Sequence, residues 1–330
     1  MGWILSGGPR RPDRHWHSDP LPLDPRVKRF LDALAAGNPP SALDTSVAQR
    51  RTQLAELMKF AGPEAPVASA EDRTVPGPAG ALAVRVYTPL NAPGPLLPGL
   101  VYFHGGGLVA GSIDTHAPIA RALAHSGACR VIAVEYRLGP EQPFPAALED
   151  ALAAVAHIGA HAAQFGIDAA RLGVCGDSAG GTLAAAVCQA IARTGGPRLA
   201  LQLLLCPILD YSRQSASRRE FARGYLIDQA TLDHDLLHYA QGADPADPRI
   251  SPARAADLDD LPPTIIHTAE FDPLRDEALD YFTRLTQSGS AVSYTCHAGM
   301  IHLFYGLGAV IPYARTAFET IGVGIRAALA

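Results

Sequence analysis

The chain has 330 residues, of which 48% are hydrophobic, and its formal net charge is −5 from 27 basic and 32 acidic residues. A chain of this length can bury one large core, and α/β folds of this size often form a single domain. The charges are dispersed along the chain, which argues against a polyanionic partner. No nucleic acid partner is therefore expected.

The cysteine spacing and the lengths of the apolar runs indicate in which cellular compartment the protein lies. The five cysteines have no Cys-x-x-Cys spacing and mostly lie in apolar runs, as buried thiols in a reducing compartment do. The first residues contain only a short apolar run before glycine, proline and arginine, so they lack the hydrophobic core of a secretory signal. The longest apolar stretch, residues 199–209, is too short to span a bilayer. We therefore expect a cytoplasmic protein with no membrane partner.

Two helices are expected before any strand. Asp24 is a candidate N-cap, Pro25 occupies the first helical position and Gly37 gives a stop. A second helix is expected over residues 46–60. Because both helices precede the first strand, they lie outside the core of any sheet.

The rest of the chain alternates strands and helices. Short apolar or alternating runs predict strands at residues 82–87, 99–103, 131–135, 171–175, 200–206, 264–269 and 292–296. Helices are expected at residues 116–125, 146–165, 179–193 and 274–287, and from about residue 312. This alternation predicts an α/β fold, with a parallel sheet and helices on both faces.

One polar insertion interrupts the alternation. Sequence rich in arginine and aspartate runs from Asp210 to Leu261 around a single expected helix, residues 229–239. The insertion follows the carboxyl end of a strand, which is the side where open α/β sheets bind their ligands. We expect it to cover the functional site.

A serine lies at the turn between the expected strand 171–175 and the helix that follows. The string is Gly176-Asp177-Ser178-Ala179-Gly180. Glycines two residues on either side of the serine suit a sharp strand-to-helix turn, in which any side chain would collide with its neighbours. Such a turn exposes the hydroxyl of Ser178 as a nucleophile. An ordinary glycine-rich turn is the alternative interpretation.

Further motifs give the chain a family resemblance. They are HGGG at 104–107, YRLGPE at 136–141, PFPAA at 143–147 and GDSAGG at 176–181. In this combination and order they resemble the hormone-sensitive-lipase group of α/β-hydrolase carboxylesterases. The part of the chain that carries the motifs runs from about residue 98 to residue 304.

This resemblance implies a specific architecture. It implies the α/β-hydrolase fold, with a mostly parallel eight-stranded sheet, helices on both faces and a helical cap. Residues 1–66 would supply cap helices, residues 67–330 the catalytic domain, and residues at about 210–256 a second piece of the cap. Relatives often pair through the last strand and the helix after it, so the resemblance also suggests a homodimer.

A serine nucleophile needs a base and a carboxylate that orients the base. In this fold the order along the chain is serine, acid, histidine, so both partners should follow Ser178. Asp272 comes just past a strand, in a string that matches the family's Asp-Pro-Leu, and is the expected acid. Its alternative role is a helix N-cap, and Glu270 and Asp276 are the substitutes.

His302 is the expected base. It follows the last strand in a loop that reaches toward the serine turn, and it matches the family motif. His297, on the edge of that strand, is the alternative. The residue after the histidine is usually glycine in relatives and is Leu303 here, which puts the shape of the loop in question.

Charge stabilisation is expected from backbone N–H groups. Attack on an ester carbonyl creates an oxyanion, and the expected donors to it are Gly105, Gly106 and Ala179. Glycines suit the upstream loop because the backbone itself must approach the substrate. His104 is expected to anchor that loop through hydrogen bonds rather than to transfer protons.

The substrate pocket is expected to include Leu108, Asp177, Ile301 and Leu303. Relatives commonly have a bulky aromatic residue at the position of Leu108, so the pocket should be wider there. A cap of two short pieces offers little surface for docking on lipid. Esters with acyl chains of about two to eight carbons are therefore expected.

The resulting interpretation is a serine carboxylic ester hydrolase that acts through an acyl-enzyme on a small-molecule ester. The mechanism needs no cofactor and no metal, and the sequence has no clustered set of metal ligands. An amidase or deacetylase is an open alternative, since the same groups cleave amides. A non-catalytic small-molecule receptor is another, because the fold does not fix the function.

Overall fold

One mixed sheet organises the computed structural model, which describes residues 22–90 and 94–330. Within these residues the strand order is β1-β2-β4-β3-β5-β6-β7-β8. The strands are β1 (Val67–Gly77), β2 (Gly80–Pro89), β3 (Leu97–Phe103), β4 (Arg130–Val134), β5 (Ile167–Asp177), β6 (Leu201–Leu205), β7 (Thr264–Phe271) and β8 (Val292–Ile301). Strands β3 to β8 pair in parallel, whereas β2 pairs antiparallel with both β1 and β4. The predicted α/β fold, with eight strands mostly in parallel, is confirmed.

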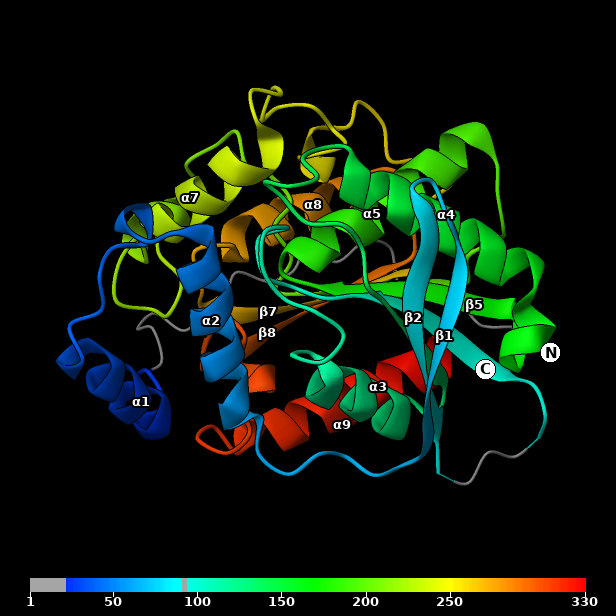
Figure 1. The fold of residues 1–330 in the computed structure, drawn as a ribbon, viewed down its shortest axis with the longest axis horizontal. Helices are drawn as coiled ribbons and strands as arrows, with labels where there is room; N and C mark the ends of the chain where they lie inside the picture. The colour runs from blue at the N-terminus through cyan, green and yellow to red at the C-terminus, as the bar shows by residue number, and fades with distance from the viewer. Residues whose placement is uncertain (1–21, 91–93) are drawn as a thin grey trace.

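Helices cover both faces of the sheet. The helices are α1 (Pro25–Ala36), α2 (Val47–Met58), α3 (Ala117–Gly127), α4 (Ala146–Ala160), α5 (Ala179–Thr194), α6 (Ala216–Glu220), α7 (Gln229–Ala240), α8 (Arg275–Gln287) and α9 (Tyr313–Ala328). Short 3-10 turns occupy Ala42–Asp44, Lys59–Ala61, Ala162–Phe165, Pro252–Arg254 and Phe304–Gly306. Helices α3 and α9 pack together on one face, and α4, α5 and α8 lie on the other (Figure 1).

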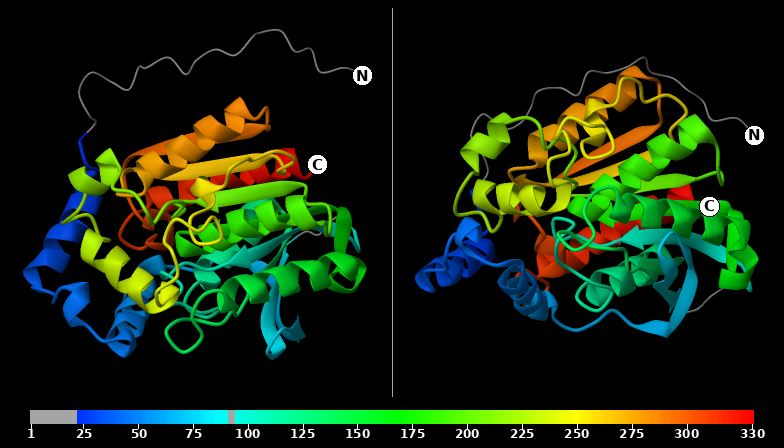
Figure 2. Two further views of the ribbon diagram at one scale, coloured as in Figure 1. Left: turned by 90° about the horizontal axis from the view of Figure 1, so that it is seen from above. Right: turned by 45° about the horizontal axis from the view of Figure 1, so that its top comes forward.

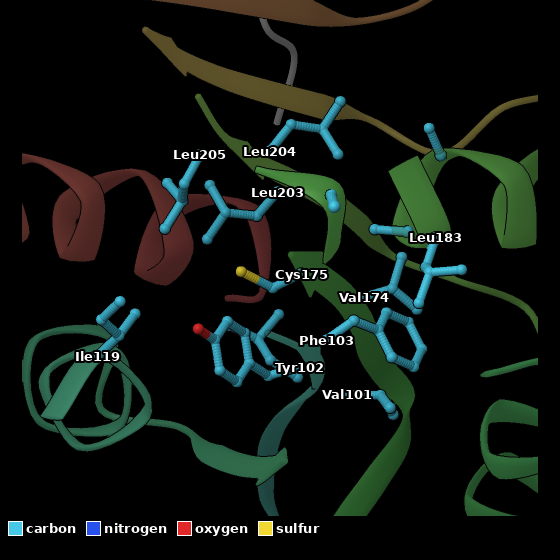
Figure 3. Packing of buried hydrophobic residues seen from close by; sticks show 14 of the residues in the cluster. Val101, Tyr102, Phe103, Ile119, Val174, Cys175, Leu183, Leu203, Leu204 and Leu205 are labelled. Atoms are coloured by element: carbon cyan, nitrogen blue, oxygen red, sulfur yellow. The ribbon is translucent and has the colours of Figure 1, made fainter. Parts of the chain in front are cut away.

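The core fills the space between the central strands and these helices. Side chains of β3, β5 and β6 point to both faces, including Val101, Phe103, Val174, Leu203 and Leu205 (Figure 3). All five are completely shielded from solvent. Parallel strands covered on both faces need such continuous apolar runs, which is why the sequence predicted these strands well.

Strand β1 is an element that sequence patterns missed. Its sequence, VASAEDRTVPG, is polar, and most of its side chains are at least partly exposed. It pairs only with β2 at the edge of the sheet. An edge strand has only one neighbour and little burial, so it needs no apolar alternation. The short helix α6 was missed as well, because its sequence is polar.

The first two helices begin and end as their sequences indicate. Asp24 accepts hydrogen bonds from the N–H groups of Arg26 and Val27 at the start of α1. Ser46 and Gln49 form a reciprocal capping box at the start of α2. These caps satisfy backbone donors that a helix terminus otherwise leaves free.

Helices α1, α2 and α7 gather at one end of the molecule (Figures 1 and 2). The 3-10 turn that follows α1, Ala42–Asp44, contacts α7, so these segments from distant parts of the sequence lie side by side. Among the residues that the structure describes, no helix is both long and apolar enough to cross a bilayer.

Candidate active site

Ser178 occupies a strained turn between β5 and α5. Its backbone angles are φ 52° and ψ −121°, which side-chain-bearing residues rarely adopt. A Cβ on Gly176 would overlap the backbone of Gly180, and a Cβ on Gly180 would overlap the backbone of Phe103. The two flanking glycines are therefore required by the close approach of strand and helix, as the sequence indicated.

A continuous chain of hydrogen bonds starts at this serine. Oγ of Ser178 lies 3.0 Å from Nε2 of His302, and Nδ1 of His302 lies 2.8 Å from Oδ2 of Asp272. The three side chains come from turns after β5, β7 and β8, and each is less than 10% exposed. Because a carboxylate only accepts, Nδ1 carries the proton and Nε2 is free to accept the proton of the hydroxyl.

Asp272 has a second contact besides the one with His302. Its other carboxylate oxygen, Oδ1, accepts a hydrogen bond of 2.8 Å from the N–H of Leu274, just before α8. This second bond fixes the carboxylate against the start of the helix. Helix α8 begins at Arg275 after Leu274, and no side chain of the described residues caps it, so the alternative role of Asp272 as its N-cap is wrong.

The alternative residues are engaged elsewhere. His297 lies 3.0 Å from Nδ1 of His267 through its Nε2, and burial lowers the pKa of His297 to about 4. The carboxylate of Glu270 accepts from the N–H of Gly299 at 2.7 Å. Asp276 accepts from the N–H of Ser217 on α6 at 2.8 Å. None of these three lies in the hydrogen-bond chain that begins at Ser178.

The upstream glycine loop requires a correction to the expected set of oxyanion donors. The N–H of Gly105 donates to Oδ1 of Asp177 at 3.0 Å, so this donor is already occupied. Gly106 and Gly107 have φ of +116° and +68°, and within residues 22–90 and 94–330 their N–H groups have no acceptor. The free N–H groups of the loop therefore belong to Gly106 and Gly107.

Asp177 lies under this loop. Its side chain is completely buried, and Oδ1 also accepts a hydrogen bond of 2.5 Å from the hydroxyl of Tyr102. Burial raises the pKa of Asp177 to about 6, partly offset by the bond from Tyr102. Oδ2 has no hydrogen-bond partner within the described residues, and Nε2 of His116 lies 3.7 Å from it. Asp177 therefore supports the glycine loop through Gly105, and its place in a substrate pocket stays a prediction.

His104 makes contacts of the kind expected from a loop anchor. Its ring stacks on Tyr136 with centroids 4.3 Å apart, and the hydroxyl of Tyr136 donates to the carbonyl of His104 at 2.6 Å. Its Nδ1 lies 2.8 Å from the carbonyl oxygen of Gly105. Burial lowers the pKa of His104 to about 3, so it is a neutral ring at ordinary pH.

The apolar residues expected in the pocket are closed off from solvent. Leu108 and Ile301 are fully buried, and Leu303 is 6% exposed. Leu303 has φ +59°, the left-handed conformation that glycine adopts most easily. With leucine in this conformation, His302 reaches Ser178.

Cys206 was not singled out from the sequence. Potential ligand atoms of Cys206, Asp272 and His302 all lie within 4.8 Å of one another, so among the described residues these three form a group that could hold a metal ion. Burial raises the pKa of the Cys206 thiol well above its usual range. A cation there would compete with a thiol proton and with the bond between His302 and Asp272. The sequence signal was weak, because the three residues follow three different strands.

A separate groove lies away from this chain of hydrogen bonds. It has a volume of about 980 Å³ and is lined by residues of α3, of α9 and of the segment after α2. Ser178, Asp272 and His302 are not among its lining residues. The groove is therefore distinct from any hollow above these three side chains.

Comparisons with known proteins identify the family and several similar proteins. A family model described as alpha/beta hydrolase fold matches residues 100–306. The carboxylic ester hydrolase LipN of Mycobacterium tuberculosis is 38% identical over 86% of this chain and 77% of its own length. The esterase LipI of the same organism is 35% identical over 93% of this chain and 95% of its own.

Solved structures give the same result. The ester-hydrolase EH1AB1 from the metagenome of Lake Arreo superimposes with a TM-score of 0.89 at 40% sequence identity. The match covers 92% of this chain and 98% of that one. That structure contains a bipyridine phosphonate derivative.

Proposed function

This chain belongs to the α/β-hydrolase family, within its hormone-sensitive-lipase group of carboxylesterases, and we propose that it is a serine carboxylic ester hydrolase. The observation that carries the proposal is the unbroken chain from Oγ of Ser178 through His302 to Asp272, with contacts of 3.0 and 2.8 Å. The names of the relatives support ester hydrolysis rather than the amidase, deacetylase or receptor alternatives.

In the proposed first step, Nε2 of His302 removes the proton from Ser178 as Oγ attacks the ester carbonyl. Asp272 accepts from Nδ1, which keeps the proton-free Nε2 facing the serine and stabilises the imidazolium that forms. The alcohol then leaves with the proton from His302. A water molecule, activated by the same Nε2, releases the acid from the acyl-enzyme.

The oxyanion of each tetrahedral intermediate needs donors that are free before the reaction. We assign these to the N–H groups of Gly106, Gly107 and Ala179, in place of Gly105. Ala179 is the first residue of α5, where a helix leaves its N–H groups without internal partners. Each such donor contributes about 3–4 kcal/mol to the stability of the transition state.

Helices α1 and α2, together with the second cap piece at about 210–256, act in this proposal as a cap. The first 21 residues of the predicted N-terminal piece lie outside the described residues. Ser178 is only 8% exposed, and in this proposal movement of the cap admits the substrate to it. The homodimer and the cytoplasmic location inferred from the sequence remain predictions.

For the substrate we propose small esters with acyl chains of about two to eight carbons, since each methylene held in an apolar pocket contributes at most about 0.8 kcal/mol until the pocket ends. A series of p-nitrophenyl esters from acetate to laurate, with p-nitroanilides of the same acids, tests the proposal. The value of kcat/KM should rise with chain length, fall beyond about eight carbons and exceed that of each matched anilide. Faster cleavage of the anilides, or a preference for emulsified long-chain triglyceride, would contradict it.

A further inference from the structure

A buried ion pair joins helix α2 to helix α7. Nε and Nη2 of Arg50 donate to Oδ1 and Oδ2 of Asp235 at 3.2 and 2.9 Å. The two side chains are only 13% and 4% exposed. Nδ1 of His234 lies 3.0 Å from Oδ1 of the same carboxylate. A carboxylate that is so far removed from water needs partners of this kind, so the pair is a firm link between the two pieces of the proposed cap.

The carboxylate of Asp235 also packs directly against the glycine loop. A Cβ on Gly107 would overlap this carboxylate, so the absence of a side chain at Gly107 is what allows the contact. The neighbouring residue on α2, Arg51, donates to the carbonyl oxygen of Val109 at 2.8 Å. Helix α2 therefore contacts the loop itself and also supplies the cation that pairs with Asp235.

An unpaired carboxylate at this position would oppose the reaction. Negative charge develops on the substrate oxygen where the N–H groups of Gly106 and Gly107 are proposed to donate. Two like charges repel strongly when little water separates them. The two-point contact of the Arg50 guanidinium places the compensating charge on the carboxylate itself.

We propose that Arg50 is a positioning residue for ester hydrolysis, which neutralises Asp235 beside the oxyanion hole and holds its carboxylate against Gly107. The proposal rests on the proposed function, because it needs an oxyanion at Gly106 and Gly107. The proposal has one distinctive consequence. Loss of Arg50 should lower turnover because it leaves the negative charge of Asp235 unpaired beside the oxyanion. Removal of both charges should therefore restore turnover.

The test is a double-mutant cycle with Arg50→Gln, Asp235→Asn and the double variant, assayed with p-nitrophenyl butyrate. Active sites are counted by fluorophosphonate labelling, so that kcat refers to folded enzyme. We expect Arg50→Gln to lower kcat about tenfold or more with a smaller change in KM, and the double variant to return to within about threefold of wild type. Arg50→Lys, which keeps the charge, should retain most of kcat.

Arg85→Gln is the control, since Arg85 pairs with Asp72 and Asp114 and touches no residue of the site. Its kcat should equal that of wild type. A double variant no faster than Arg50→Gln, or an unchanged kcat in Arg50→Gln, would overturn the proposal. If Arg50→Gln does not fold, Asp235→Asn provides the test, because the proposal predicts that removal of this charge does not impair the reaction. A tenfold loss of kcat in Asp235→Asn would then overturn the proposal. Wild-type enzyme that neither labels nor turns over would be a failure of the proposed function.

Discussion

The backbone N–H of Gly105 donates to the buried carboxylate of Asp177 at 3.0 Å, so the residue just before the serine holds the loop that faces the serine. The hydroxyl of Tyr102 donates to the same oxygen. This contact fixes the spacing between two motifs that are more than 70 residues apart in the sequence. It also leaves Gly106 and Gly107, rather than Gly105, with free donors.

Replacement of Asp177 by alanine should therefore impair both stability and turnover. The N–H of Gly105 and the hydroxyl of Tyr102 would lose their acceptor in a buried place, at a cost of about 1–3 kcal/mol for each unsatisfied donor. The loop would shift, and kcat should fall by about ten- to a hundredfold. Urea unfolding and initial rates with p-nitrophenyl butyrate measure the two effects.

Asp177→Asn is the matched comparison, because its amide oxygen can still accept from Gly105. We expect a smaller loss of kcat than in the alanine variant. Tyr102→Phe removes only one donor and should affect kcat least. Equal activity of Asp177→Ala and wild type would contradict the structural role that we assign to this carboxylate.

The buried pair His267 and His297 predicts how stability depends on pH. Burial lowers the pKa of His267 to about 3, with a further contribution from His297. Between about pH 6.5 and pH 3 the unfolded chain binds this proton and the folded protein does not, so the protein loses stability as pH falls through that range. Between pH 7 and pH 5, one such histidine lowers the free energy of unfolding by about 2 kcal/mol.

In His267→Gln, the difference between the unfolding free energies at pH 7 and pH 5 should therefore shrink by about 2 kcal/mol. Urea unfolding of wild type and variant at the two pH values gives this difference directly. The same pH dependence in both proteins would show that His267 takes up its proton in the folded state.

Removal of residues 1–66 tests the proposed cap. Helices α1 and α2 bury Val27, Phe30, Leu54 and Met58, so their loss exposes apolar surface as well as removing Arg50. We expect kcat/KM for p-nitrophenyl butyrate to fall by about tenfold or more and dye binding to increase. Unchanged kinetics in a folded truncated protein would show that these helices do not serve the site.

The sequence could predict the elements and residues that local rules determine. The strand-turn-helix around Ser178 needs its glycines for steric reasons, and the central strands need apolar residues on both faces. Asp272 and His302 follow strands whose carboxyl ends meet at one edge of the sheet. Their meeting with Ser178 therefore follows from the topology that the alternation predicted.

Other features depend on contacts that no local pattern records. The edge strand β1 has a polar sequence because one neighbour is enough for it. The hydrogen bond from the N–H of Gly105 to Asp177 could not be predicted, because the sequence position of Asp177 is equally compatible with a residue of the substrate pocket. The ion pair between Arg50 and Asp235 joins two helices with many polar residues in their sequences. No local pattern predicts it, because the position of one helix against the other depends on the whole fold.

Covalent labelling of Ser178 tests the central claim most directly. Wild-type protein and Ser178→Ala should be treated with a fluorophosphonate, and the modified peptide located by mass spectrometry. We predict one label per chain, on Ser178, with simultaneous loss of ester hydrolysis. The folded alanine variant should remain unlabelled, with kcat lower by about 10³ to 10⁶. Labelling at another residue, or more than about a tenth of wild-type kcat in the folded variant, would contradict the account.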